Sequence, residues 1–326
     1  MKTKAIRIHQ HGGPEQMRWE EIELAPPAAG EVQIRHQAVG LNYIDVYHRT
    51  GLYPTPDLPC TLGMEGAGIV VAVGTDVTDF KVGDRVAYAS PPLGAYAEER
   101  NLAAHRLVHL PQGIDFEQAA AMMLQGMTAE YLLRRTYPVK AGETILFHAA
   151  AGGVGLIFCQ WAKHLGATVI GTVGSEEKAE IARAHGCDHT ILYREEDVVA
   201  KVKEITNGRG VPVVYDGIGK DTWESSLNSL AMRGMMVSFG SASGKVPAVE
   251  LATLTAGGSL YLTRPTLMHY TADTGELRDS AKALFELVQA GVIRIEVNQR
   301  FPLAEAAQAH RELEARQTTG STILTI

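Results

Sequence analysis

The chain has 326 residues, enough for two domains, and its 45% apolar and 21% charged residues are typical of a soluble globular protein. A net charge of −7, without a cluster of Lys and Arg, argues against nucleic acid as the main partner. The three cysteines are widely separated, which excludes a disulfide framework or a zinc knuckle, and no apolar run suits a signal peptide or a membrane span, so we expect a cytoplasmic protein.

The first third of the sequence is predicted to be rich in β-strands. Strand-like stretches occur at 4–9, 32–39, 66–73 and 80–86. Residues 40–49 read as the end of a strand that runs into a short helix. Asp115 and Gln118 have the spacing of a capping box, which predicts a helix over 117–133. We therefore expect an irregular, barrel-like antiparallel domain, followed by a helix that leads into a second domain.

From Gly142 onward the pattern changes to alternating strands and helices. Strands are expected at 144–148, 168–173, 189–193, 211–216, 234–239 and 259–263. Helices are expected at 154–165, 176–186, 195–207, 222–232 and 275–290. This alternation predicts right-handed crossovers and a doubly wound parallel sheet of six strands. A final strand, helix and strand, at 292–297, 301–316 and 321–326, are expected to return to the first domain.

A glycine-rich turn opens this second domain, in the stretch TILFHAAAGGVG at 144–155. Strand, tight turn and helix in this order are typical of a dinucleotide-binding unit, whose three fingerprint positions are Ala150, Gly152 and Gly155 here. We expect Gly152 to let the backbone approach a pyrophosphate at the helix N-terminus, and Gly155 to let the helix pack close to the strand. The alternative is a glycine-rich turn without a ligand, which the six following strands make less favoured.

The residues after the second strand bear on which nucleotide binds. An NAD site places an Asp or Glu about 20 residues after the glycine turn, whereas this sequence has Val173 and Gly174 there. Ser175 and Lys178 would supply a hydrogen-bond donor and a positive charge to a 2′-phosphate, so NADPH is favoured. The acidic pair at 176–177 weakens this prediction unless both side chains face solvent and complement the helix dipole.

The sequence resembles the zinc-independent quinone oxidoreductases of the medium-chain dehydrogenase/reductase superfamily, the zeta-crystallin-like group. The resemblance covers essentially the whole chain and rests on segments at 40–54 (GLNYIDVYHRTGLYP), 62–74, 82–88, 149–175, 213–227 and 257–267. It implies an α/β protein with a GroES-like, β-rich catalytic domain at 1–125 and 266–326, and a Rossmann NADPH-binding domain at 126–265. It also implies a homodimer or tetramer that pairs through the edge strand of the Rossmann domain at 259–264.

Asn42 and Met64 stand where zinc-dependent alcohol dehydrogenases of the superfamily have a Cys and a His that bind the catalytic metal. Neither an Asn amide nor a Met thioether is a suitable catalytic zinc ligand. Three close histidine pairs lack an acidic or Cys partner at ligand spacing, and we interpret them as surface or hydrogen-bonded residues: His9 and His11, His105 and His109, His185 and His189. The resemblance therefore implies a metal-free NADPH-dependent quinone reductase, in which an electron-poor acceptor takes hydride or single electrons from nicotinamide.

Four residues are candidates for holding the acceptor carbonyl, by their place in the family pattern: Asn42, Tyr47, Tyr53 and Gln125. Asn42 could donate through its amide and a tyrosine through its hydroxyl. The alternatives are that Asn42 only orients the nicotinamide ribose and that the tyrosines only wall the pocket. Asp45 and Glu65 also match the family pattern, and without a metal we expect them to be hydrogen-bond partners.

The residues expected to contact NADPH lie mostly at turns that follow strands. They are Asn42, Thr128, Ala150, Gly152, Gly153, Val154, Gly174, Ser175, Lys178, Tyr193, Phe239, Gly240, Ser241, Thr263, Arg264 and Arg316. Tyr193 could pack on the adenine or be a half-buried residue at the rim of the sheet. Arg264 and Arg316 could neutralise phosphate charge or be ordinary solvent-facing charges.

Two other classes of function remain open at this point. A medium-chain enoyl or alkenal reductase would share every cofactor residue and differ only in the shape of its pocket. A non-enzymatic crystallin-like or RNA-binding role is the third possibility, and the acidic net charge argues against RNA.

Overall fold

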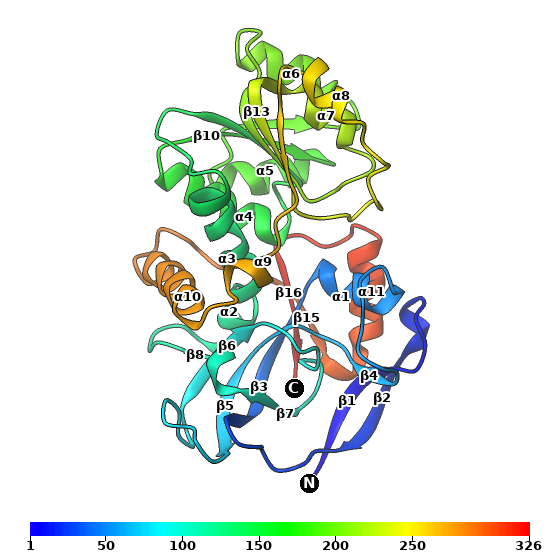
Figure 1. Ribbon diagram of the computed structural model, residues 1–326, viewed down its shortest axis with the longest axis vertical. Coiled ribbons are helices and arrows are strands. Elements are labelled where there is room, and N and C mark those ends of the chain that lie inside the picture. The colour runs from blue at the N-terminus through cyan, green and yellow to red at the C-terminus, as the bar shows by residue number, and fades with distance from the viewer. The chain divides into compact units, whose positions relative to one another are not determined.

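The computed structural model describes all 326 residues, which divide into two compact units (Figure 1). The first unit contains Met1–Met127, Thr271–Gln289 and Ile295–Ile326, so both ends of the chain contribute to it. The second contains Thr128–Tyr270 and Ala290–Arg294. Residues 266–270 and 290–294, which we expected in the first unit, belong to the second.

The first unit is built on two sheets. The larger has the order β15-β16-β3-β5-β6-β8, with β7 also paired to β3, and the smaller has the order β2-β1-β4. The strands are β1 (Lys2–Ile8), β2 (Met17–Glu23), β3 (Glu31–Leu41), β4 (Cys60–Thr61), β5 (Glu65–Val73), β6 (Arg85–Ala89), β7 (Glu99–Ala103), β8 (Val108–His109), β15 (Val297–Pro302) and β16 (Ser321–Thr325). Because β16 pairs with β15 on one side and β3 on the other, the last strand of the chain lies inside the sheet.

The helices associated with the first unit are α1 (Tyr43–Thr50), α2 (Phe116–Ala120), α3 (Met123–Tyr131), α10 (Thr274–Gln289) and α11 (Ala306–Glu314). Short 3-10 turns occur at Pro14–Gln16, Ala104–Arg106 and Leu303–Glu305. Helix α3 continues into residues of the second unit, where a π-helical stretch follows at Leu132–Thr136. The capping box at Asp115 is confirmed, since its Oδ1 accepts from the Gln118 N–H at 2.7 Å. The single helix predicted over 117–133 is wrong, because it breaks after Ala121, whose carbonyl accepts a hydrogen bond from the Ser321 hydroxyl.

Strand β15 and helix α11 were predicted too early in the chain. The strand expected at 292–297 is β15, which begins at Val297, and the helix expected from 301 begins at Ala306. Strand β15 is an edge strand, where Pro302 costs no ladder hydrogen bond. The strand that was predicted from the sequence therefore begins several residues before the strand that forms.

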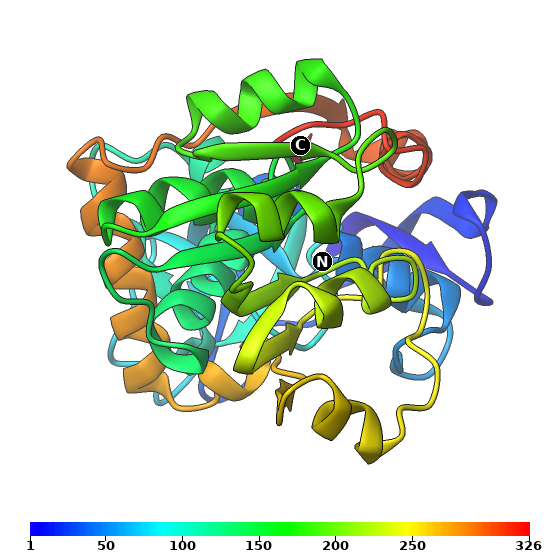
Figure 2. The same ribbon diagram turned by 90° about the horizontal axis from the view of Figure 1, so that it is seen from above.

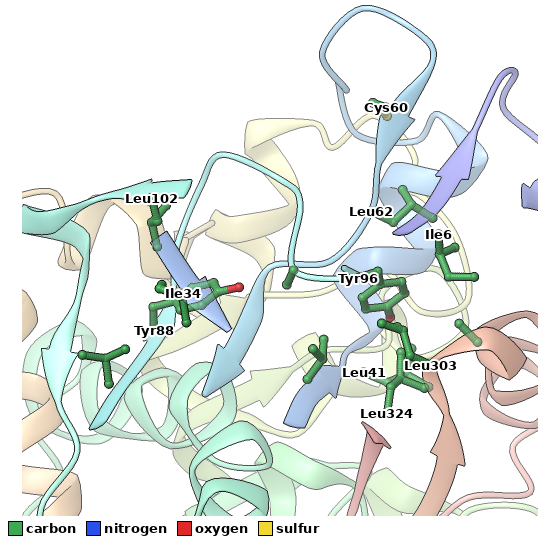
Figure 3. Packing of buried hydrophobic residues seen from close by; sticks show 14 of the residues in the cluster. Ile6, Ile34, Leu41, Cys60, Leu62, Tyr88, Tyr96, Leu102, Leu303 and Leu324 are labelled. Carbon is green, nitrogen blue, oxygen red and sulfur yellow. The ribbon is translucent and has the colours of Figure 1, made fainter. Parts of the chain in front are cut away.

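One core joins the two ends of the chain in the first unit. Figure 3 shows Leu303 and Leu324, from the C-terminal segment, beside Leu41 and Tyr96. Ile6 of the first strand belongs to the same buried cluster. Burial of these side chains stabilises the unit only when the first and last strands are both in place.

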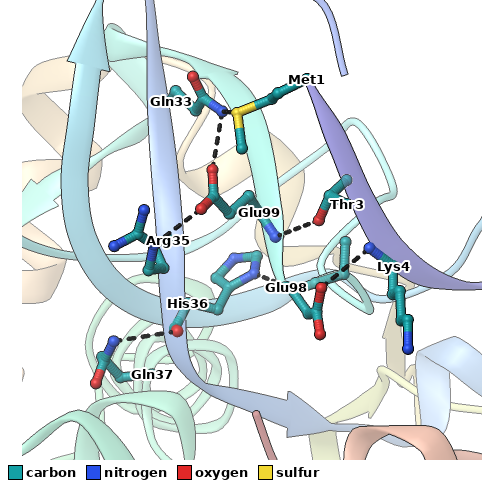
Figure 4. A network of polar contacts seen from close by, with 10 residues as sticks. Met1, Thr3, Lys4, Gln33, Arg35, His36, Gln37, Glu98 and Glu99 are labelled. Atoms are coloured by element: carbon teal, nitrogen blue, oxygen red, sulfur yellow. Dashed lines mark hydrogen bonds and ion pairs between the residues drawn. The ribbon is translucent and has the colours of Figure 1, made fainter. Parts of the chain in front are cut away.

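Polar side chains fix the register of strands β1, β3 and β7 (Figure 4). The Glu99 carboxylate accepts hydrogen bonds from Gln33 at 2.9 Å and Arg35 at 2.8 Å. The backbone N–H of Glu99 donates to the Thr3 hydroxyl at 3.2 Å. A one-residue slip of β7 would remove all three bonds, so this network specifies the pairing.

The second unit is a six-stranded parallel sheet with the order β11-β10-β9-β12-β13-β14. Its strands are β9 (Thr144–His148), β10 (Thr168–Val173), β11 (His189–Leu192), β12 (Val211–Asp216), β13 (Leu230–Ser238) and β14 (Tyr261–Thr263). Its helices are α4 (Gly153–His164), α5 (Glu176–Ala184), α6 (Val198–Ile205), α7 (Trp223–Asn228), α8 (Leu251–Ala256) and α9 (Leu267–Tyr270). Figure 2 shows helices on both faces of this sheet, which confirms the doubly wound prediction.

Two local predictions in this unit are corrected. The helix expected over 222–232 ends at Asn228, because β13 already begins at Leu230. Arg233 has a left-handed backbone with φ 60°, so the strand reaches its pairing with β12 through an irregularity instead of a regular ladder. Helix α8 had not been predicted.

None of the helices in the protein is long and apolar enough to cross a bilayer.

Candidate functional site

Asn42 lies where β3 ends and α1 begins, surrounded by buried polar groups of the first unit. Its backbone N–H donates to Asp45 Oδ2 at 2.9 Å, which fixes the first turn of the helix. Its side-chain nitrogen lies 2.6 Å from Glu65 Oε2, and Gln125 Nε2 lies 3.2 Å from its Oδ1. All four residues are buried. The structure thus brings together Asn42 and Gln125, two of the four candidates for holding the acceptor.

The two carboxyl groups beside Asn42 are unusually easy to protonate. Burial raises the pKa of Glu65 to about 8, although the N–H of Leu124 and the Asn42 amide stabilise its charged form. Burial also raises the pKa of Asp45 to about 7, against the effect of its two hydrogen bonds from Asn42 and Tyr96. Oδ1 of Asp45 is buried without a hydrogen-bond partner. Both carboxyl groups are hydrogen-bond partners, as the sequence had led us to expect.

The amide contacts continue from Glu65 through Asn42 and Gln125 to Ser321 of β16. The Ser321 hydroxyl lies 2.7 Å from Gln125 Oε1 and 2.9 Å from the carbonyl of Ala121. When Glu65 is ionised, each group donates toward it, beginning with Ser321. When Glu65 is neutral, its proton needs an acceptor, and a half-turn of both amides reverses every bond so that Ser321 donates to Ala121. The protonation of Glu65 and the orientation of the Asn42 amide are therefore linked.

A second chain of hydrogen bonds holds Asp45 from the other side. Arg49 Nη1 lies 3.0 Å from His310 Nδ1, and His310 Nε2 lies 3.1 Å from the Tyr96 hydroxyl. Because a guanidinium only donates, Nδ1 accepts and Nε2 carries the hydrogen, which leaves Tyr96 to donate to Asp45 at 3.0 Å. Burial lowers the pKa of His310 to about 3, so the ring is neutral as this arrangement requires. Sequence reasoning missed these residues, since they come from three distant segments.

The candidate tyrosines lie next to Asn42 along the chain. Tyr47 is buried on α1, and Tyr53 is half-buried in the turn that follows, with ring centroids 4.9 Å apart. Tyr43 extends the group, at 5.6 Å from Tyr47. Burial raises the pKa of Tyr43, and the charge of Arg316 works in the opposite direction, which places Arg316 near this aromatic group. The first unit thus holds a cluster of three tyrosine rings on and just after the helix that Asn42 precedes.

The glycine turn of the second unit is organised around the carbonyl of Ala149. Ala149 has φ 60°, and its carbonyl accepts from the Gly152 N–H at 3.0 Å. A Cβ on Gly155 would lie 2.5 Å from this carbonyl, so only glycine fits, which explains its predicted role in close helix packing. Ala150 replaces the first fingerprint glycine, and a Cβ on Gly171 of the next strand would lie 2.5 Å from its methyl. The glycine on β10 makes room for the alanine in the turn.

Three candidates for nucleotide selectivity gather after β10 and β11. Ser175 caps α5 and accepts from the Lys178 N–H at 3.4 Å, so its own hydroxyl hydrogen can be donated elsewhere. A Cβ on Gly174 would lie 3.1 Å from the Tyr193 hydroxyl, so the Tyr193 side chain lies over Gly174. Arg194, which the sequence reasoning missed, has its guanidinium 5.9 Å from the Tyr193 ring. This edge therefore carries two cations and a hydroxyl donor.

Glu176 and Glu177 do not oppose these cations from within the site. Both are exposed on the first turn of α5, where negative charge is favourable. Glu176 pairs with Arg183 at 2.8 Å along the same helix. The alternative in which both side chains face solvent therefore holds, and the acidic pair does not weaken the prediction of NADPH.

The turn after β13 and the end of β14 are joined through Arg264. Its guanidinium donates to the carbonyl of Ser238 at 2.7 Å and to the Ser241 hydroxyl at 3.3 Å. A Cβ on Gly240 would lie 2.3 Å from the carbonyl of Gly217, so glycine is required where the turn after β13 touches the turn after β12. The remaining candidates are placed as follows: Phe239 after β13, Thr263 at the end of β14, Gly153 and Val154 on the first turn of α4, and Thr128 on α3.

The residues at the two zinc-ligand positions of the superfamily do not fit a metal site. Met64 is buried, and the Asn42 amide is occupied by Glu65 and Gln125. No group of three or more His, Cys, Asp or Glu side chains is arranged to hold a metal ion.

Two family models match the chain. The alcohol dehydrogenase GroES-like domain matches residues 28–140, and a model described as zinc-binding dehydrogenase matches residues 153–287. The second model covers the nucleotide half of the chain and not the positions of Asn42 and Met64.

Individual proteins match over nearly the full length. A quinone oxidoreductase of Pseudomonas aeruginosa is 60% identical over 99% of both chains. The crystal structure of Escherichia coli quinone oxidoreductase complexed with NADPH superimposes with a TM-score of 0.98 at 52% identity, covering 99% of this chain and 100% of that one. A 2-haloacrylate reductase of Burkholderia sp is 48% identical over 98% of both chains.

Proposed function

Because the chain belongs to the zinc-independent quinone oxidoreductases of the medium-chain dehydrogenase/reductase superfamily, we propose that it reduces quinones with NADPH and without a metal. The observation that carries this proposal is the match, over 99% of the chain, to a quinone oxidoreductase complexed with NADPH. The protein is an oxidoreductase. The loss of both zinc ligands agrees with an acceptor that needs no Lewis acid.

We assign NADPH binding to the turns at the carboxyl ends of the strands in the second unit. The N-terminus of α4, at Gly152, Gly153 and Val154, offers free N–H groups and a favourable dipole to the pyrophosphate. Ser175 and Lys178 would hold the 2′-phosphate, with Tyr193 against the adenine. When bound, NADPH supplies the hydride from nicotinamide C4.

We assign the acceptor to the polar groups of the first unit. Reduction of a quinone places negative charge on its carbonyl oxygen, which requires hydrogen-bond donors. Asn42 and Gln125 present amides there, and Tyr47 and Tyr53 present hydroxyls. Glu65 would control which way the Asn42 amide points, because the two are hydrogen-bonded at 2.6 Å.

The direct test is NADPH oxidation with small quinones, followed by the loss of NADPH absorbance. We expect turnover with NADPH that EDTA changes by less than about twofold, because no step needs a metal. The control is the same assay on protein dialysed against zinc. Loss of activity in EDTA that zinc restores would contradict the metal-free proposal, and absence of NADPH oxidation with every quinone would contradict the function itself.

Reduction of an activated alkene is the second candidate, supported by the 48% identity to a 2-haloacrylate reductase. Both reactions deliver hydride to an electron-poor carbon conjugated to a carbonyl or carboxyl group, so they can share one cofactor site. A comparison of kcat/KM for benzoquinones, enones and 2-haloacrylates separates them. A preference for haloacrylates of more than about tenfold would favour the second candidate.

We also propose a cytoplasmic homodimer that pairs through strand β14. This strand ends the sheet of the second unit, and its Tyr261 and Leu262 are exposed, as is the neighbouring Met232. An exposed apolar edge strand favours pairing with another strand. Light scattering after size exclusion should give twice the 35.2 kDa of one chain, and Tyr261→Lys should halve this mass. Val82→Lys, which changes an exposed apolar residue of the first unit, should leave the dimer intact.

A further inference from the structure

A continuous chain of buried side-chain hydrogen bonds crosses three neighbouring strands of the second unit. His148 ends β9, and its Nδ1 lies 3.0 Å from the Thr172 hydroxyl of β10. Its Nε2 lies 2.9 Å from the Ser226 hydroxyl of α7, which donates to Asp216 Oδ2 at the end of β12 at 2.7 Å. None of the four side chains is more than about 2% exposed.

The direction of every bond in this chain follows from the groups at its end. The Asp216 carboxylate accepts four hydrogen bonds, since the N–H groups of residues 218 and 219 donate to Oδ1, and the hydroxyls of Thr222 and Ser226 donate to Oδ2. Ser226 has then used its one hydrogen and must accept from His148 Nε2–H. His148 Nδ1 is therefore unprotonated and accepts from the Thr172 hydroxyl. Burial lowers the pKa of His148, which favours this neutral ring.

The chain ends on the glycine turn. Once the Thr172 hydroxyl donates to His148, its oxygen is available to accept, and the N–H of Ala149 donates to it at 3.3 Å. The carbonyl of Thr172 accepts from the N–H of Ala150 at 3.1 Å. Ala149 holds a left-handed backbone that costs a residue with a side chain about 1 kcal/mol or more, so the turn needs such anchors.

At its other end, the chain reaches the turns after β12 and β13. The carbonyl of Asp216 accepts from the N–H of Phe239 at 2.8 Å, and the carbonyl of Gly217 touches Gly240 so closely that no Cβ fits there. One polarised chain therefore joins the glycine turn to the turn at 239–241. We assigned the first of these turns to the pyrophosphate, and Phe239, Gly240 and Ser241 of the second are among the residues expected to contact NADPH.

We propose that His148, with Thr172 and Ser226, is a positioning residue for the dinucleotide, which holds the glycine turn and the 239–241 turn at a fixed separation before NADPH binds. This inference rests on the proposed function, because it needs NADPH as the ligand. None of the three side chains is assigned a contact with the cofactor. They act through the backbone of Ala149 and through Asp216, which lowers the cost of ordering the site on binding.

The test compares NADPH affinity in variants that cut the chain at different points. Thr172→Val keeps the shape of the side chain but removes its hydrogen-bond donor and acceptor. We expect the Kd for NADPH to rise about tenfold, with little change in kcat at saturation. Ser226→Ala should raise the Kd by a similar factor. Because both substitutions interrupt the same chain of hydrogen bonds, the Kd of the double variant should be no higher than that of Thr172→Val alone.

Three controls separate positioning from general loss of structure. Ser225→Ala removes a neighbouring hydroxyl of α7 that donates to the carbonyl of Thr222, and it should bind NADPH like the wild type. Thr172→Ser retains the hydroxyl and should restore affinity. Ala149→Gly, added to Thr172→Val, should recover most of the lost affinity, because glycine adopts the left-handed turn without the anchor.

The outcomes distinguish this inference from the proposed function. Variants whose urea midpoints fall while Kd for NADPH stays that of the wild type would show a purely structural chain and overturn the inference. Additive losses in the double variant, or no rescue by Ala149→Gly, would also overturn it. Failure of the wild type to bind NADPH in the same titration would instead overturn the proposed function.

Discussion

Replacing Glu65 with glutamine is expected to leave the stability of the protein almost unchanged near pH 4.5 and to raise it by about 5 kcal/mol near pH 9. Burial raises the pKa of this carboxyl from 4.5 in the ordinary case to about 8. Glutamine reproduces the hydrogen bonds of the neutral acid, since its amide can accept from Leu124 and donate to Asn42. The variant therefore keeps the favourable form of the side chain at every pH.

The sign follows from proton binding. Between pH 4.5 and about 8 the folded protein holds a proton on Glu65 that the unfolded chain has released. Stability from the neutral acid is thus fully present below pH 4.5 and is lost as pH rises through about 8. Burial raises the pKa of Asp45 to about 7, so this carboxyl adds a further loss of stability with rising pH, over a lower pH range. The two carboxyl groups are close enough to titrate as a coupled pair.

Urea unfolding curves at pH 5, 7 and 9 measure the difference, with Trp19 as the reporter of the first unit after Trp161 and Trp223 are replaced by phenylalanine. Glu305→Gln, an exposed carboxylate of the same unit, is the matched control and should follow the pH dependence of the parent. Parallel curves for the parent and Glu65→Gln would show that Glu65 is ionised throughout this range, and the linkage to the Asn42 amide would be lost with it.

Replacing Lys178 with glutamate is expected to raise the KM for NADPH by about 100-fold and the KM for NADH by less than about twofold. Lys178 is half-buried on the first turn of α5, next to the Ser175 cap, whereas Glu176 and Glu177 are exposed and Glu176 pairs with Arg183. Glutamate would bring a negative charge toward a 2′-phosphate of the same sign. NADH has a hydroxyl there, which a carboxylate can accept from.

A graded series makes this test specific. Lys178→Gln removes the charge without reversing it, so its KM for NADPH should lie between those of the parent and Lys178→Glu. Lys163→Glu makes the same charge change at the far end of α4, where it is exposed, and should not discriminate between the two nucleotides. Equal effects of Lys178→Glu on both nucleotides would show that another group, such as Arg194, recognises the 2′-phosphate.

Local sequence patterns predicted the six strands of the second unit. Most of these strands are largely buried apolar runs, so alternation with helices indicated six strands in a parallel sheet. The errors occur where contacts with distant residues determine the local structure. Where the helix breaks, the carbonyl of Ala121 accepts a hydrogen bond from Ser321, 200 positions later, and no local pattern reports such a partner. Leu230 continues a helical apolar pattern, yet pairing with β12 makes it the start of a strand.

The candidate site divides in the same way. Gly155 could be chosen from the spacing of the glycine turn and Asn42 from the family resemblance, and their contacts then gave each a physical reason. The chain through His148 could not be found, because its four side chains come from β9, β10, α7 and β12 and share no spacing in the sequence. Glu65 was expected to be a hydrogen-bond partner, but its raised pKa depends on burial that only the fold reveals.

The position of β16 inside the first sheet has a consequence for biosynthesis. Strand β3 is synthesised almost 300 residues before its partner β16 (Ser321–Thr325), so this edge of the sheet stays open until β16 has been made. The second unit lacks nothing once residue 294 has been made. We expect the second unit to fold first. Until β16 has been made, the edge of β3 stays unpaired, and only chaperones or the short length of this edge prevent it from pairing with a wrong strand.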